Sequence, residues 1–490
     1  MAVSVAKNAF YLTMATIGQK VLAFLYFLFI AKIFLKEDTG AYFLALTVTT
    51  IFSVVADFGI TPVVIREVAK EAERAMGLVR RALGLKIPII VLSVIGAIIA
   101  ARLLGYDSRI QLLVLLACLV MIEDAISLLY FGVLRGLHVL RYESLGMMIG
   151  ELITVTVGGL SLLLQPSLIL LIVALVAGSL FNAIFSALLV VKKLGWLAIV
   201  PSFERPLNLL KISLPFALAG GFSKLYSYID SILLSAFIGV GAVGIYAVAY
   251  KMTYAFQFLP MAFVAALYPG MSSMVGREPK KLAEMFEKSM WYLLVIGSPI
   301  AFGIFAIAPD VIALTRKEYS EAVPILQVLV FVLLPLFLDF PIGSLLNAAG
   351  RQATKTAIMG ATMVINTIFN ILLIPLLGIM GAAVSAEISF WFLFLAGLYF
   401  VPQIIPGLPW KKLVWLFVKI IGSGALMAFI TIVIRPNVGF IPVVIIAGII
   451  YTILLFATRA VSLTQLKELK TMLGRKKIIP TYAEDSTPHA

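Results

Sequence analysis

Apolar runs that are long enough to cross a bilayer recur along almost the whole chain, and this pattern leaves few ways to fold. Each run is close to or longer than the roughly 20 residues that a helix needs to span the hydrocarbon core. The chain of 490 residues is 62% hydrophobic and 13% charged. Soluble domains average about 45–50% apolar and about 25% charged residues. The excess apolar surface must face lipid, so the sequence predicts an all-α polytopic membrane protein.

The apolar runs predict about fourteen transmembrane helices. We place them at 8–35, 40–65, 87–104, 110–134, 144–164, 167–191, 212–238, 241–269, 290–314, 323–347, 356–377, 380–403, 413–434 and 439–460. The first apolar run is too long for a cleavable signal peptide and has no small-residue cleavage site after it.

Matched residues about 204 positions apart indicate an internal repeat. The matches are Lys20 with Lys224, Gly40 with Gly244, Tyr42 with Tyr246, Ala45 with Ala249, Thr49 with Thr253, and Phe52 with Phe256. We therefore predict two six-helix lobes, at 1–200 and 201–404. Two extra helices at 405–462 and a polar, disordered tail at 463–490 complete the predicted organisation.

The distribution of basic residues accounts for the net charge of +14 without nucleic acid. Most lysines and arginines fall in alternate loops, which is the bias that cytoplasmic loops of membrane proteins carry. We therefore expect a multi-pass protein of the plasma membrane with both termini in the cytoplasm. Residues 69–85 mix apolar and basic side chains, which predicts an amphipathic helix at the lipid headgroups.

The inventory of reactive residues is small. The single cysteine, Cys118, excludes an intramolecular disulfide. The two histidines, His138 and His489, do not suggest a metal site, and no phosphate-binding glycine loop is present. We predict no cofactor and no catalytic residue, and we leave coupling to Na⁺ or H⁺ open.

Three lysines lie inside predicted spans where they cannot easily reach the interface: Lys20, Lys224 and Lys251. A charged side chain facing lipid at mid-membrane costs about 2.5–3.5 kcal/mol on insertion scales. They must therefore face a wet cavity or pair with carboxylates. We favour capture of an anionic group for Lys20 and Lys224, because the repeat places both, and hold capture and structural pairing equal for Lys251.

Carboxylates inside predicted spans are candidate partners, gates or ion-coupling groups: Glu123, Asp124, Asp230, Asp339 and Glu387. Glu123 and Asp124 are neighbours on a helix, so at most one faces a cavity squarely. Structural pairing is an equal explanation for these two, and an ordinary proline kink is the simpler one for Asp339. For Asn366 and Asn370, hydrogen bonds between helices are the expected role.

Asp57 and Arg66 flank the predicted cytoplasmic end of the second span. Two hypotheses have equal weight. The pair forms a gate that breaks when the lobes rock, or the two side chains cap and orient the helix end.

Several short motifs resemble those of the polysaccharide-export and O-antigen flippases, within the multidrug, oligosaccharidyl-lipid and polysaccharide (MOP) exporter superfamily. They are Gly40-Ala41-Tyr42, Asp57-Phe58-Gly59, Arg66-Glu67, the run from Gly244 to Lys251, Leu346 to Arg351, Leu373-Ile374-Pro375, Gly378 and Gly381-Ala382-Ala383. The resemblance covers about residues 5–460. It implies two lobes around a central cavity that opens alternately to either side.

The resemblance implies a flippase that moves a polyprenyl-pyrophosphate-linked oligosaccharide from the inner to the outer leaflet, with Lys20 and Lys224 at the pyrophosphate. A proton- or sodium-coupled multidrug or metabolite exporter is the alternative, and a membrane polysaccharide polymerase or ligase is a weaker one because the outer loops are short. We expect a monomer, because substrate passes within one chain. Its expected partners are the glycolipid, membrane lipids and polysaccharide-assembly enzymes.

Overall fold

The computed structural model describes residues 5–204 and 206–461, and these residues form helices and connecting turns with no β-strand. The fold class predicted from the apolar runs is therefore confirmed. The predicted tail at 463–490, with His489, lies outside the described residues. The chain forms two compact units that divide between Leu408 and Pro409.

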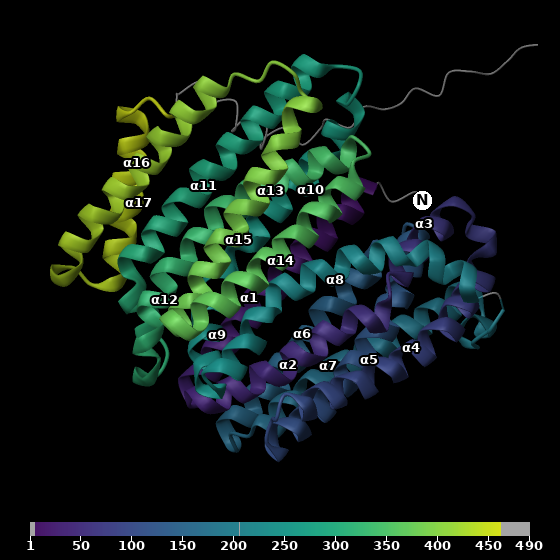
Figure 1. The fold of residues 1–490 in the computed structure, drawn as a ribbon. Coiled ribbons are helices and arrows are strands. Elements are labelled where there is room, and N and C mark those ends of the chain that lie inside the picture. The colour runs from purple at the N-terminus through teal and green to yellow at the C-terminus, as the bar shows by residue number, and fades with distance from the viewer. Residues whose placement is uncertain (1–4, 205, 462–490) are drawn as a thin grey trace, which may run out of the picture. The chain divides into compact units, whose positions relative to one another are not determined.

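The first seven α-helices pack together as one group, which we call the N-terminal lobe. They are α1 (Val5–Ile33), α2 (Lys36–Asp57), α3 (Ile60–Lys70), α4 (Ala75–Leu103), α5 (Ser108–Gly136), α6 (Leu140–Leu164) and α7 (Leu168–Leu194). Figure 1 shows α2, α4, α5, α6 and α7 side by side, and packing of α2 on α4 and α5, α5 on α7 and α6 on α7 holds them. Helix α1 packs along α6.

The next eight α-helices form the C-terminal lobe. They are α8 (Pro206–Phe237), α9 (Val240–Tyr254), α10 (Phe258–Met274), α11 (Pro279–Ala313), α12 (Ala322–Leu329), α13 (Leu333–Ala348), α14 (Gln352–Leu377) and α15 (Ile379–Phe400). Helices α13, α14 and α15 pack on one another beside α10 and α11 (Figure 1). In the second compact unit, α16 (Trp410–Ile434) packs on α17 (Phe440–Ala457).

The helix starts repeat at the spacing that the sequence predicts. Helix α2 begins at Lys36 and α9 begins at Val240, 204 residues later. Helix α4 begins at residue 75 and α11 at residue 279, again 204 residues later.

Among the described residues, twelve helices are long and apolar enough to cross a membrane, or up to thirteen if the bent pair Val240–Val264 and Leu267–Met274 counts as one span. The predicted span at 212–238 corresponds to α8, which is not one of the twelve. Its length of 32 residues is ample. Helix α8 is more polar than the twelve, because it contains several serines and tyrosines together with Lys224 and Asp230. These polar side chains need a surface other than lipid.

The predicted second span, 40–65, is broken in the structure. Phe58 and Gly59 both take left-handed backbone conformations, with φ of 46° and 67°, and separate α2 from α3. Glycine suits the second position because a Cβ on Gly59 would lie 2.6 Å from the backbone of α8 at Ser213 and Ala217. The break therefore lets α3 approach α8 closely.

The apolar face of the predicted amphipathic segment at 69–85 packs against protein instead of remaining free to contact lipid headgroups. Its apolar side chains Ala75, Val79 and Ala82 are fully buried against α3 and α5, in a cluster with Val64 and Leu134. The segment is amphipathic, as the sequence predicts, and its apolar side covers the core of its own lobe. The sequence pattern alone does not distinguish an apolar face that contacts lipid from one that contacts the protein core.

Candidate functional site

A cavity of about 410 Å³ lies where the two lobes meet. Its walls come from α2, α5 and α7 of the N-terminal lobe and from α8 and α9 of the C-terminal lobe. Four charged side chains line it: Asp57, Asp124, Lys224 and Lys251. The structure thus brings together two of the three intramembrane lysines that the sequence singled out.

The two lysines in the cavity are held beside aromatic rings. Lys224 Nζ lies 5.6 Å from the centroid of the Tyr228 ring, and Lys251 Nζ lies 5.2 Å from that of Phe43. Cations are attracted to the faces of aromatic rings at this range. Within the described part of the chain, neither ammonium group has a carboxylate at ion-pair distance. Both ammonium groups are therefore available to bind an anion in the cavity.

Lys20 lies on α1 and is exposed, but it is not among the residues that line the cavity. Its charge still acts on those of Lys224 and Lys251. Glu151 on α6 joins this group, because it accepts a hydrogen bond of 3.3 Å from Gln19 and interacts electrostatically with Lys20 and Lys251. The sequence reasoning missed Glu151, although a lone carboxylate inside the predicted span 144–164 was a usable signal.

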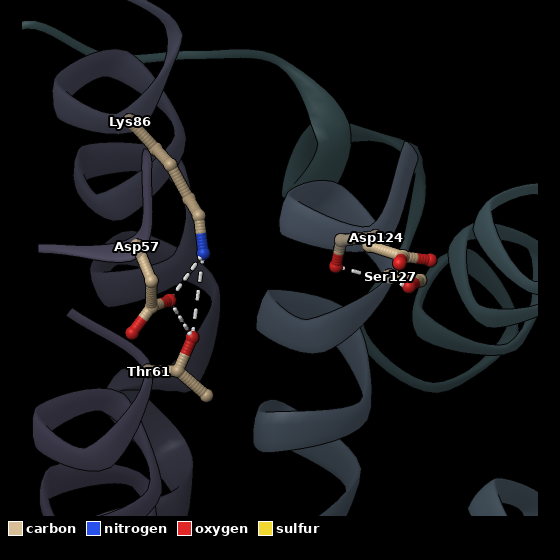
Figure 2. A network of polar contacts seen from close by, with 5 residues as sticks. All are labelled: Asp57, Thr61, Lys86, Asp124 and Ser127. Carbon is tan, nitrogen blue, oxygen red and sulfur yellow. Dashed lines mark hydrogen bonds and ion pairs between the residues drawn. The ribbon is translucent and has the colours of Figure 1, made fainter. Parts of the chain in front are cut away.

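Asp57 binds Lys86 and not Arg66, so the Asp57–Arg66 pair of the gate hypothesis, one of two with equal weight, is absent from this structure. Lys86 Nζ donates to Asp57 Oδ1 at 2.6 Å and to Thr61 Oγ1 at 3.3 Å, while Thr61 donates to Asp57 (Figure 2). The Lys86 side chain is 1% exposed and that of Asp57 is 17% exposed. The predicted span at 87–104 leaves Lys86 in the preceding loop, but α4 begins eleven residues before Lys86 and carries it into the protein.

Arg66 lies away from this triad on the exposed side of α3. It donates to Glu67 Oε1 at 2.8 Å, and Lys70 donates to the same oxygen at 3.3 Å. Burial acts to raise the pKa of the Glu67 carboxyl, but these two hydrogen bonds outweigh it and hold that pKa below its ordinary value. Arg66 therefore belongs to a surface cluster and forms no gate with Asp57 in this structure.

Of the neighbouring carboxylates on α5, only Asp124 lines the cavity. Ser127, one turn on, donates its hydroxyl to the Asp124 backbone carbonyl at 3.1 Å (Figure 2). Glu123 is half-buried, and its Oε2 has no hydrogen-bond partner among the described residues. The hundred-degree turn between adjacent helical residues explains why only one of the two reaches the cavity.

Asp230 is part of a buried network that joins three helices of the C-terminal lobe. Its carboxylate accepts hydrogen bonds of 2.7 Å from Tyr246 on α9 and from Asn370 on α14. Asn370 also donates to Asn366 Oδ1 at 3.1 Å. The expected interhelical hydrogen bonding of the two asparagines is therefore present. Among the described residues, the Asn370 Oδ1 atom has no partner.

Asp339 and Glu387 are also outside the cavity lining. Lys355 Nζ donates to both carboxylate oxygens of Asp339 at 2.7 Å, which ties α14 to α13. In the N-terminal lobe, Glu143 ties α6 to α5 through Arg135. Glu143 and Lys355 are each the fourth residue of their helix, so the two lobes have similarly placed ion pairs of opposite polarity.

One end of the interface between the lobes is closed by polar contacts, which join the start of α2 to the 3₁₀-helix η4 (Lys317–Glu321). They are Lys36 with Glu321 at 3.1 Å, Thr39 with the Tyr319 hydroxyl at 2.7 Å, Tyr319 with the Phe34 carbonyl at 3.2 Å, and Arg316 with the Ile33 carbonyl at 2.6 Å. We call this group the closing contacts.

A family model described as "Polysaccharide biosynthesis protein" matches residues 5–275, which is more than half of the chain, and a second, MatE, matches residues 215–372. The "Probable low-salt glycan biosynthesis flippase Agl15" of Haloferax volcanii is 25% identical over 79% of this chain and 81% of its own length. The "Uncharacterized membrane protein MJ1068" of Methanocaldococcus jannaschii is 28% identical over 66% of this chain and 65% of its own length.

Among solved structures, the lipid II flippase MurJ in an inward closed conformation has the same fold, with a TM-score of 0.73 and 16% identity over 95% of this chain and 99% of that one. An inward-facing multidrug resistance MATE transporter gives a TM-score of 0.68 at 16% identity, over 80% of this chain and 96% of that one. The chain thus belongs to the family described as "Polysaccharide biosynthesis protein".

Proposed function

We propose that the protein is an alternating-access flippase, which moves a polyprenyl-pyrophosphate-linked oligosaccharide between the leaflets of the membrane. The observation that carries the proposal is that Lys224 and Lys251 line a cavity between the lobes, with no carboxylate of the described residues at ion-pair distance from either ammonium group. Lys20 adds a third positive charge nearby.

The electrostatic balance of the cavity suits an anionic head group. A pyrophosphate cannot enter hydrocarbon alone, because burying an unpaired ion is very costly. Asp57 is already neutralised by Lys86, so Asp124 is the remaining acid of the lining against two lysines. The lipid tail can stay in the bilayer while the head group crosses, and no covalent bond changes.

The direction of movement follows from the membrane potential. Moving one charge through 100 mV is worth about 2.3 kcal/mol, and a potential that is negative inside drives an anion outward. A coupled cation would add to this force. The buried oxygens of Asp230, Asn366 and Asn370 are the best candidate site, because hard cations such as Na⁺ prefer carboxylate and amide oxygens.

The alternative exporter of cationic drugs requires a cavity in which carboxylates dominate, and the lining here favours anions. A polymerase or ligase would need catalytic groups on a sizeable outer loop, whereas the connections beside the closing contacts, such as residues 34–35 and 238–239, are two residues long. Both alternatives are therefore weaker than the flippase.

Native mass spectrometry of the protein extracted gently from its membranes tests the proposal. We expect a polyprenyl-pyrophosphate glycolipid to copurify with the wild type and to be lost from Lys224→Ala/Lys251→Ala and from Lys20→Ala/Lys224→Ala. The control is Lys32→Ala, which removes an exposed lysine at the end of α1. If no anionic lipid copurifies, or if all forms retain the same lipids, the lysines are structural and the proposal is wrong.

A further inference from the structure

One face of α8 continues beyond Lys224 as a row of hydroxyl-bearing side chains. Lys224, Ser227, Tyr228 and Ser231 all line the cavity. Their spacing of three, four and seven residues puts them on one side of a helix. Because a helix rises 1.5 Å per residue, this row extends about 10 Å along the cavity wall. Part of the polar surface of α8 is thus turned toward the cavity.

The facing helices supply further hydrogen-bonding groups. Thr50 and Ser53 of α2 and Asp124 of α5 line the same cavity, together with Tyr250 of α9. Ser53 donates its proton to the Thr50 carbonyl at 2.7 Å, and Ser227 donates to the Ser223 carbonyl at 2.8 Å. Each hydroxyl oxygen keeps lone pairs that can accept a hydrogen bond from a ligand.

Tyr228 has a distinct position in this row. Its ring is half-buried and lies beside the Lys224 ammonium group, and its hydroxyl has no hydrogen-bond partner in the part of the chain that the structure describes. Tyr250, in contrast, stacks on Tyr254 with ring centroids 4.1 Å apart. Tyr228 therefore offers both an apolar ring and a polar tip to a molecule in the cavity.

We propose that the wall from Ser227 to Ser231 is a saccharide subsite, in which a pyranose ring packs on Tyr228 while Ser227, Ser231 and Asp124 bind its hydroxyl groups. This inference rests on the proposed capture of a pyrophosphate by Lys224. The first sugar of such a lipid is bonded directly to the pyrophosphate, so it must lie within a few ångströms of the cation that holds the phosphates. Ser227 and Tyr228 are the cavity-lining residues one turn along from that cation.

The chemistry of the wall matches a sugar better than an apolar or cationic ligand. A pyranose has an apolar face of C–H groups and a rim of hydroxyls, which correspond to the tyrosine ring and to the serine and carboxylate oxygens. The cavity volume of about 410 Å³ lies within the range of roughly 300–1,000 Å³ for ligand pockets. This volume suits a short head group, so later sugars of a long glycan would extend beyond the subsite.

The test compares three probes on the purified full chain in nanodiscs: polyprenyl pyrophosphate without sugar, the same lipid bearing one N-acetylglucosamine, and the same lipid bearing one glucose. We expect the wild type to bind at least one glycosylated probe more tightly than the bare lipid. Tyr228→Leu should reduce that preference roughly threefold to tenfold, the range for one aromatic packing contact. Its effect on the affinity for the bare lipid, through the lost contact with Lys224, should be smaller than its effect on the glycosylated probe, and Tyr228→Phe should keep most of the preference.

Two control variants separate this inference from the proposed function. Tyr226→Leu removes a tyrosine of the same helix that packs on Phe390 outside the cavity lining, and it should not change the sugar preference. Lys224→Ala should lower the affinity for all three probes by the same factor. No sugar preference in the wild type, or equal losses for bare and glycosylated lipid in Tyr228→Leu, would overturn the subsite alone. Failure of the wild type to bind any of the three lipids would overturn the pyrophosphate site and the subsite together.

Discussion

At the residue scale, the two partners of the Asp57–Lys86 pair are not equally dependent on each other. Lys86 is 1% exposed, whereas Asp57 is 17% exposed and lines the cavity. Removing one partner of a buried pair costs about 3–5 kcal/mol, because the other charge is left without compensation. We therefore expect Asp57→Ala to lower the thermal unfolding midpoint more than Lys86→Met, which leaves a carboxylate that water can reach. The reverse order would contradict the assigned burial.

Glu151 is the second residue whose effect can be predicted, because it opposes the charges of Lys20 and Lys251. Glu151→Gln should raise the affinity for bare polyprenyl pyrophosphate roughly fivefold, the effect of about 1 kcal/mol of removed repulsion. A lipid-binding titration at low and high salt measures this change, with Glu67→Gln on the exposed side of α3 as the control. Unchanged affinity would place Glu151 outside the electrostatic reach of the substrate.

At the element scale, the crossing of α2 and α9 depends on two glycines at the same repeat position. A Cβ on Gly40 would lie 2.0 Å from the Val240 carbonyl oxygen, and one on Gly244 would lie 2.0 Å from that of Lys36. Gly244→Ala should therefore push α2 and α9 apart. Double electron–electron resonance between labels at Leu35 and Glu318, in a Cys118→Ser background, should show a longer mean distance.

Gly241→Ala is the matched control for Gly244→Ala, because its Cβ would contact only the flexible Glu37 side chain, at 3.1 Å. If Gly241→Ala and Gly244→Ala broaden the distance distribution equally, the close backbone contact is not what sets the spacing of the two helices.

At the scale of the first compact unit, the closing contacts must break if the cavity is to open at that end. Tyr319 is fully buried and bonds both Thr39 and the Phe34 carbonyl, whereas Lys36 and Glu321 are partly exposed. Exposed ion pairs contribute about 0–1 kcal/mol to stability, whereas the loss of a buried hydrogen bond costs about 1–3 kcal/mol of stability. Tyr319→Phe should thus raise the open population at the labelled end roughly tenfold, and Lys36→Ala should have little effect. Equal shifts would contradict this ranking.

The fold could be predicted because helix length and apolar content are local properties. The run lengths predicted a polytopic helical protein, and the repeat placed α2 and α9 in matching positions. Local properties do not reveal tertiary partners, so nothing in the sequence indicated that Lys86 and Lys355, each one residue before a predicted span, pair with carboxylates. The same limit applies to residues 69–85, whose apolar face fits lipid and protein equally well.

The candidate site was predicted in part for a related physical reason. A lysine inside an apolar run is conspicuous, so Lys224 and Lys251 were found before the cavity was known. Serine and tyrosine are tolerated in any membrane helix, so Ser227 and Tyr228 gave no signal until the structure placed them beside Lys224. Which side of a helix faces the cavity is decided by packing, so the sequence could not show that Lys224 and Lys251 line the cavity whereas Lys20 lies outside its lining.

The ion pairs of opposite polarity in the two lobes differ in the place of their first partner. Glu143 and Lys355 hold the same place in their helices, but Arg135 is the second-last residue of α5 and Asp339 lies nine residues before the end of α13. The internal repeat therefore does not relate the two pairs residue by residue, although each pair ties the start of one helix to the helix before it. A link between neighbouring helices is common to both lobes, whereas the position and the sign of the charges that form it are not.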